Sequence, residues 1–146
     1  ETDEEAFRQA QNQYPGRFAA HMMYSPNLST AIYGGADLFL MPSISEPCGL
    51  SQMIAMRYGT IPVVRETGGL RDSVVPYNKF TGEGTGFSFA NINVQEMTGV
   101  LSEAVNLYHN EPKAWKALQK NAMTADFSWE KSAKAYEEIY GWVTGK

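Results

Sequence analysis

Short apolar segments alternate with segments of helical periodicity along most of the chain. The apolar segments carry no polar alternating face, which is typical of strands buried on both sides; they lie at residues 17–24, 37–41, 60–65 and 86–89. Elsewhere, apolar residues recur every three or four positions, which predicts helices; these run from the acidic start of the chain to Tyr14, and over residues 26–35, 49–58, 94–109, 112–123 and 129–143. Strands that alternate with helices at short spacing predict an α/β fold, a Rossmann-like parallel sheet with helices on both faces.

Local signals support several of these boundaries. Ser25 and Pro26 are suited to be the N-cap and the first residue of the helix that follows them. Gly59 suits the left-handed position just after a helix. Residues 66–72 are expected to form a glycine-bearing turn, and residues 76–84 a loop. With no internal repeat, one compact unit is the simplest organisation.

The segment from Pro42 to Gln52 places a carboxylate shortly before a glycine that opens a helix. The free N–H groups of a first helical turn, with a partial charge of roughly +0.5, make an anion site that a diphosphate would fit. Glu46 is itself an anion, so it is better suited to neutral hydroxyl groups such as those of a sugar. This combination indicates a nucleotide sugar. The Glu-Pro-x-Gly pattern also serves to turn a chain and begin any helix, so alone it does not separate a site from a turn.

Three candidate features follow three of the predicted strands. They are Tyr24 after the first, the segment from Glu46 to Ser51 after the second, and the segment from Thr67 to Gly69 after the third. Each alone has an ordinary structural explanation, as a packed tyrosine or a plain turn. Ligands of open parallel sheets bind at the carboxyl ends of the strands, so the three together favour a site there.

Composition excludes several functions and indicates the cellular compartment. The 146 residues carry a net charge of −4, which gives no basic field for nucleic acid. No apolar run could span a bilayer, and no signal peptide is recognisable. A single Cys excludes an internal disulfide and fits a reducing cytosol. The chain lacks an initiator Met and starts on a helix that leads into a strand, so we expect a piece of a longer enzyme.

The residues from Pro42 to Asp72 resemble a known family signature. They read Pro-Ser-x-x-Glu-Pro-Cys-Gly-Leu-x-Gln-x-x-Ala-x-Arg-Tyr-Gly-Thr-Ile-Pro-Val-Val-Arg-x-Thr-Gly-Gly-Leu-x-Asp, as in bacterial glycogen synthases and plant starch synthases. Nearly the whole chain takes part in the resemblance, which extends to Tyr24-Ser25, Ala36-Asp37, Gly84-Thr85-Gly86-Phe87, Trp115 and Ser128-Trp129-Glu130. The resemblance implies a retaining glucosyltransferase of GT-B architecture that moves glucose from ADP-glucose onto an α-1,4-glucan.

The resemblance also implies roles for individual residues. Glu46 would be the catalytic residue that contacts the donor glucose, and Tyr24 would stack on adenine. Four residues would receive the diphosphate through their backbone: Cys48, Gly49, Leu50 and Ser51. Another group would close the donor pocket near the sugar: Thr67, Gly68 and Gly69. The family uses no metal and no cofactor beyond the donor substrate, and it places the enzyme in the cytoplasm, or in the plastid of a plant.

Departures from wider GT-B patterns refine the assignment. Many related transferases carry a second Glu eight positions after the first, where this chain has Ile54, and starch and glycogen synthases also lack it. The upstream Arg and Lys that clamp the phosphates in the family are missing, as is the N-terminal domain. Residues 1–146 would therefore be a C-terminal nucleotide-sugar-binding domain without its first strands, inactive alone, with the missing domain as its partner.

Rival hypotheses remain for function and for single residues. A UDP-glucose-dependent transferase of the same architecture is one alternative, and a noncatalytic nucleotide- or glucan-binding module is another. Cys48 at a helix N-terminus is either a reactive thiol or a small buried residue. His21 and His109 show no metal or catalytic pattern and are interpreted as structural or surface residues. The apolar stripes of the last three helices are typical of core, although the helix 129–143 could expose its stripe when the other domain is absent.

Overall fold

The computed structural model describes residues 2–145, which divide between Ile32 and Tyr33 into two compact units. The single unit expected from the sequence is thus not what the structure has. The first unit contains helix α1 (Asp3–Gln13), whose start is a reciprocal capping box between Thr2 and Glu5. Helix α2 (Pro26–Gly35) begins there, and Ser25 Oγ accepts a hydrogen bond from the Leu28 N–H as the cap prediction requires.

The strand predicted over residues 17–24 is wrong, because the described structure has no strand there. A strand needs a neighbour to pair its main-chain groups, and these residues bond locally instead. The N–H groups of Arg17 and Phe18 donate to the carbonyl of Tyr14, and that of Ala20 donates to the Gln11 side chain. The segment therefore continues from the end of α1 as irregular chain.

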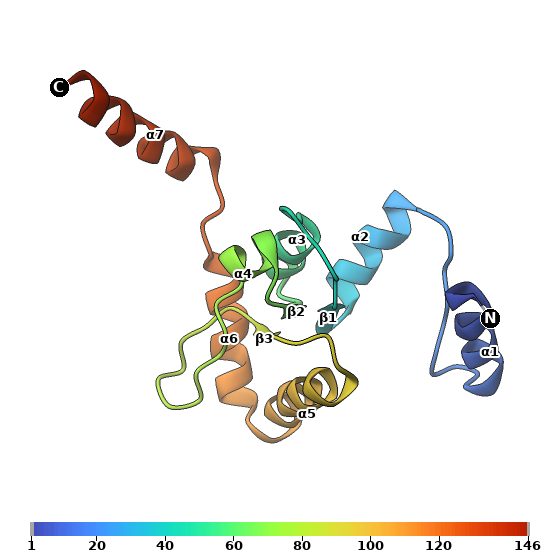
Figure 1. The fold of residues 1–146 in the computed structure, drawn as a ribbon. Helices are drawn as coiled ribbons and strands as arrows, with labels where there is room; N and C mark the ends of the chain where they lie inside the picture. The colour runs from blue at the N-terminus through green and yellow to red at the C-terminus, as the bar shows by residue number, and fades with distance from the viewer. Residues whose placement is uncertain (1, 146) are drawn as a thin grey trace. The chain divides into compact units, whose positions relative to one another are not determined.

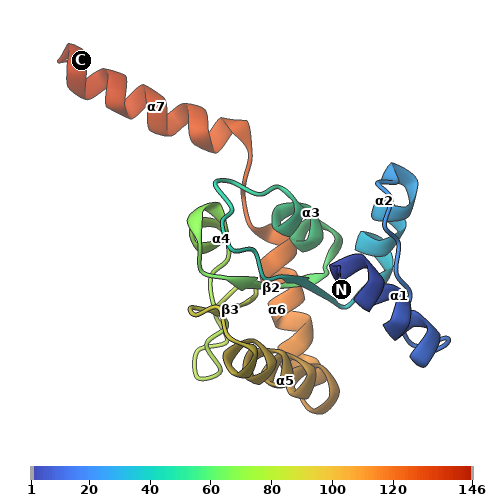
Figure 2. The same cartoon turned by 45° about the vertical axis from the view of Figure 1, so that its right-hand side comes forward.

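The second unit contains a three-stranded parallel sheet in the order β1 (Leu38–Met41), β2 (Ile61–Arg65), β3 (Phe87–Phe89). Leu38 is paired with Ile61, and Val63 with Phe87, so the three predicted strands of this unit are confirmed. Helix α3 (Ser51–Tyr58) connects β1 to β2, and α5 (Val94–Asn110) follows β3. Figures 1 and 2 show α3 on one side of the sheet and α5 on the other, as the expected two-sided cover requires.

The core lies between the sheet and its helices. Strand β2 is buried from Ile61 to Val64 because it has a neighbour on each side, and α3 contributes Met56. Helices α5 and α6 (Pro112–Thr124) cover this centre with the side chains of their apolar stripes, which include Ala104, Leu107, Trp115, Leu118 and Ala122. The stripe predicted to be core on α6 is confirmed, whereas that of α5 is confirmed only in part, because Val105 and Tyr108 are exposed.

The remaining elements differ in part from their predictions. The turn expected at residues 66–72 is a short helix, α4 (Gly68–Ser73), because the Val74 N–H bonds back to the Leu70 carbonyl. The loop 76–84 is confirmed, apart from a bridge of Pro76 to Gly86. Helix α7 (Trp129–Thr144) forms where expected but buries none of its residues, so its aromatic stripe is not core in the described chain.

Candidate functional site

The loops that follow β1 and β2 meet backbone to backbone at the carboxyl ends of these strands. The Gly69 N–H donates a 3.1 Å hydrogen bond to the Glu46 carbonyl. A Cβ atom on Gly68 would overlap that carbonyl, and one on Gly69 would overlap the carbonyl of Cys48. Only glycine allows this approach, so the structure brings together two of the three features that the sequence placed at strand ends.

Gly49 sets the start of α3. Its φ of +71° lies in the left-handed region, so helical geometry starts only at Ser51 and not at the predicted residue 49. An ideal Cβ on Gly49 would come within 3.1 Å of Glu46 Cγ, which places the half-buried Glu46 side chain against this turn. The Glu46 side chain therefore lies beside the turn that leads into the helix.

The carbonyl groups of the Glu46 loop are held by side chains from regular elements. The Arg65 guanidinium, at the end of β2, donates from Nη1 to the carbonyls of Ser43 (3.1 Å) and Ile44 (2.6 Å). Gln52, in the first turn of α3, donates from Nε2 to the carbonyl of Gly49 at 2.8 Å. Together with the hydrogen bond from the Gly69 N–H to the Glu46 carbonyl, these bonds hold the loop at its start, its middle and its end.

The N–H groups of the same loop are left without protein partners. Within residues 2–145, the N–H groups of Cys48, Gly49, Leu50 and Ser51 donate to no other protein group. They precede or form the first turn of α3, where the helix dipole adds a partial positive charge. The arrangement fits a diphosphate at these N–H groups and a hydroxyl-bearing ring at the neighbouring carboxylate.

Tyr24 belongs to the other compact unit, so the structure does not test whether it approaches Glu46. Its side chain is 89% exposed and lines a hollow within its own unit, together with Arg8 and His21. Stacking on a nucleotide base stays a prediction for this residue. His21 and His109 are exposed, as the interpretation of both as structural or surface residues allows.

Cys48 is exposed, so the alternative of a small buried residue is wrong. Its carbonyl faces Gly69 and accepts a weak 3.3 Å bond from Gln52 Nε2. The reactivity of the thiol stays a prediction.

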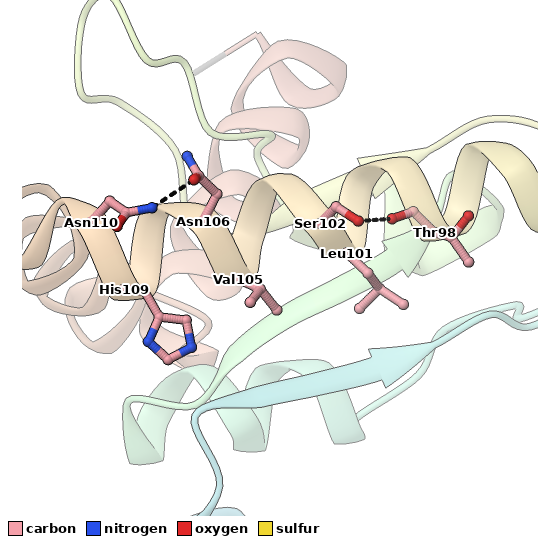
Figure 3. A pocket seen from close by; sticks show the side chains of 7 residues that line it. All are labelled: Thr98, Leu101, Ser102, Val105, Asn106, His109 and Asn110. Atoms are coloured by element: carbon pink, nitrogen blue, oxygen red, sulfur yellow. Dashed lines mark hydrogen bonds between the residues drawn. The ribbon is translucent and has the colours of Figure 1, made fainter.

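Several hollows lie in the second unit, and two of them bear on the search for a site. One groove lies between α3, together with the preceding Leu50, and the segment before α7. Its lining includes Met53, Ile54, Arg57, Asp126 and Phe127. The second runs along α5, where Leu101, Val105 and His109 share one face, as Figure 3 shows. The first of these grooves reaches the candidate site through Leu50, whereas the second contains no predicted site residue.

Sequence reasoning missed Gln52, Ser73 and Arg65, which hold the site loops in place. Gln52 is completely buried, and its Nε2 also donates to Ser73 Oγ at 2.9 Å. The available signal was a glutamine on the apolar side of a helix three residues after Gly49, because a buried amide needs partners. Among the described residues, no cluster of three or more metal-ligating side chains occurs, and no helix could cross a membrane.

The fold and the candidate site together define a class of protein, an α/β domain with a candidate ligand site at the carboxyl edge of its parallel sheet. Residues 18–124 match the family model of glycosyl transferases group 1. The chain belongs to this family.

Curated relatives and a solved structure show which members of the family this chain is similar to. The glycogen synthase of Fusobacterium nucleatum is 55% identical over 87% of this chain, and that of Lachnospira eligens is 50% identical over 94%. The catalytic domain of starch synthase IV from Arabidopsis thaliana, bound to ADP and acarbose, superposes on 97% of the chain with a TM-score of 0.81 at 39% identity. The resemblance to glycogen and starch synthases is confirmed, and the chain spans only 27% to 30% of these proteins.

Exchanging single glycines tests the backbone contact between the two loops. Gly69→Ala should lower the free energy of unfolding by about 1–3 kcal/mol, because the methyl group would force the two loops apart. The matched control is Gly99→Ala in α5, where a Cβ meets nothing within 4 Å. It should raise stability by roughly 0.5–1 kcal/mol through helix propensity. Urea denaturation of both variants measures the difference, and equal effects would contradict the contact.

Proposed function

We propose that the complete polypeptide containing this chain is a glucosyltransferase of glycogen or starch synthesis. It transfers glucose from ADP-glucose to the non-reducing end of an α-1,4-glucan, with retention of the anomeric configuration. The observation that carries the proposal is the row of unpartnered N–H groups from Cys48 to Ser51 directly beside Glu46. The names of the relatives support the same reaction class.

Each part of the site has a chemical task in this proposal. When the bond between the anomeric carbon and the diphosphate breaks, negative charge builds up on the departing oxygen. N–H groups already fixed at the start of α3 stabilise that charge without having to reorganise. Glu46 binds hydroxyl groups of the donor glucose and orients the ring for transfer. The Gly68–Gly69 backbone closes the pocket over the sugar side.

We propose ADP rather than UDP as the donor nucleotide because this chain is similar to a starch synthase. The starch synthase structure holds ADP, and its identity to this chain is 39%. A sucrose-phosphate synthase from Thermosynechococcus elongatus is 23% identical and supports the fold alone. In the proposal, the adenine ring stacks on Tyr24.

Calorimetry on the complete polypeptide tests the nucleotide assignment. ADP should bind at least tenfold more tightly than UDP, and Tyr24→Ala should remove most of the difference because it removes the stacking surface. Tyr14→Ala is the matched control, since Tyr14 is an exposed aromatic residue of the same unit with no assigned role. Tighter binding of UDP would instead favour the rival donor.

Replacement of Glu46 tests its part in transfer. Glu46→Ala in the complete polypeptide should lower kcat on the order of a hundredfold, because the donor ring loses its orienting group. Unfolding free energy should change by less than about 1 kcal/mol, since the side chain is only half-buried. Glu103→Ala, an exposed carboxylate on α5, serves as the control. Glucose incorporation into glycogen is the assay; full activity of Glu46→Ala would remove this residue from the site.

The 146-residue chain alone should transfer no measurable glucose. In the proposal, part of the phosphate clamp lies on the upstream strand–helix unit of this domain, and the acceptor surface lies on the N-terminal domain of the polypeptide. The same incorporation assay, run on this chain and on the complete polypeptide at equal molar concentration, makes the comparison. Comparable turnover by the two would contradict the claim that transfer needs residues outside this chain. Nucleotide binding without turnover in the complete polypeptide would favour the noncatalytic module.

A further inference from the structure

A buried hydrogen-bond relay connects the two loops of the site from behind. Ser73 Oγ, at the end of α4, donates to the Gly69 carbonyl at 2.6 Å. The same oxygen accepts from Gln52 Nε2, which also donates to the Gly49 carbonyl at 2.8 Å. The relay therefore runs from Gly69 through two side chains to Gly49, and so joins the α4 loop to the turn at the start of α3.

The Gln52 amide can have only one orientation in this relay. Its Nε2 atom faces the oxygens of Cys48, Gly49 and Ser73, so exchanging the amide nitrogen and oxygen would set the amide oxygen against two carbonyl oxygens. The remaining atom, Oε1, is buried and has no hydrogen-bond partner in the described structure. A buried acceptor without a partner lowers stability. Gln52 is thus poorly explained as a residue that serves stability alone.

What the relay fixes is the orientation of the peptide units. By holding the Gly49 and Cys48 carbonyls toward the interior, it sets the planes of the peptide bonds whose N–H groups open the anion site. By holding Gly69 through Ser73, it supports the Gly69 N–H bond to Glu46. One buried side chain therefore acts on the proposed phosphate contacts, and its neighbour acts on the backbone of Glu46.

We infer that Gln52 and Ser73 are positioning residues for the transfer reaction, a role that rests on the proposed function. They do not touch the donor. They lock the loop of Glu46 to the loop of Gly68 and Gly69, so that carboxylate and N–H groups keep one geometry during the reaction. Loss of either side chain should therefore slow transfer more than it unfolds the protein, because small misplacements of reacting groups are costly.

Hydrogen exchange in the 146-residue chain tests the lock without any enzymatic assay. The reporter is the Gly69 N–H, which is bonded to the Glu46 carbonyl, and the reference is the Val63 N–H in the central strand. Gln52→Met keeps the buried volume and removes the unpartnered oxygen. It should speed exchange at Gly69 at least tenfold and leave Val63 within about twofold. Equal changes at both amides, or none at Gly69, would overturn the inference.

The same variants in the complete polypeptide test positioning during transfer. Gln52→Met and Ser73→Ala should each lower kcat roughly tenfold or more while the polypeptide stays folded at the assay temperature. Ser73→Thr, which keeps a hydroxyl, should retain most of the activity. Ser102→Ala is the matched control, because it removes an equivalent bond from a hydroxyl to the carbonyl four residues earlier on α5, the bond to Thr98 in Figure 3.

The two experiments separate failure of the inference from failure of the proposed function. If the unaltered polypeptide transfers no glucose, the proposed function fails, and the exchange result alone decides whether the lock exists. If it transfers glucose and both variants match Ser102→Ala, the positioning role is refuted while the proposed function stands.

Discussion

The site depends on one contact between two backbones, where Gly68 and Gly69 lie directly against the carbonyls of Glu46 and Cys48. Any side chain at these two glycines would separate the loop after β1 from the loop after β2. Parallel pairing of β1 with β2 brings the two strand ends to the same edge, and the glycines then let the loops touch. Glu46 can therefore lie beside the start of α3 only because the two strand ends meet at one edge of the sheet and because Gly68 and Gly69 have no side chain.

The polar groups of the Glu46 loop separate into two sets with different surroundings. Several of its carbonyls accept hydrogen bonds from Arg65, Gln52 and the Gly69 N–H. Its N–H groups have no protein acceptor among the described residues. A loop in which most carbonyls accept hydrogen bonds from the protein and the N–H groups are free presents positive potential to a ligand. The side chains that hold the carbonyls therefore also shape the proposed anion site, although none of them would contact the anion itself.

Much of the second unit could be predicted from the sequence, because its elements are determined by local pattern. The apolar runs of β1 and β2 and the left-handed Gly59 after α3 agree with the prediction. The expected strand at residues 17–24 fails because pairing depends on a neighbour that no local pattern reveals. Within the site, Glu46 and the glycines could be found by spacing. For Gln52 the sequence offers only its place on the apolar side of a helix. Its partner Ser73 lies 21 residues away, and only the tertiary fold brings the two together.

The separation of Glu46 from the free N–H groups explains how a negatively charged ligand could be held beside a negatively charged side chain. The N–H groups from Cys48 to Ser51 are not satisfied by the carboxylate, because Glu46 accepts no hydrogen bond from them. The helix start therefore keeps its capacity for an external anion, while the carboxylate keeps its own for hydroxyl groups. A ligand with a diphosphate at one end and a neutral polyhydroxyl ring at the other satisfies both, whereas an inorganic anion satisfies only the first. In the proposed function, the site thus discriminates by the order of charge and hydroxyl groups along the ligand.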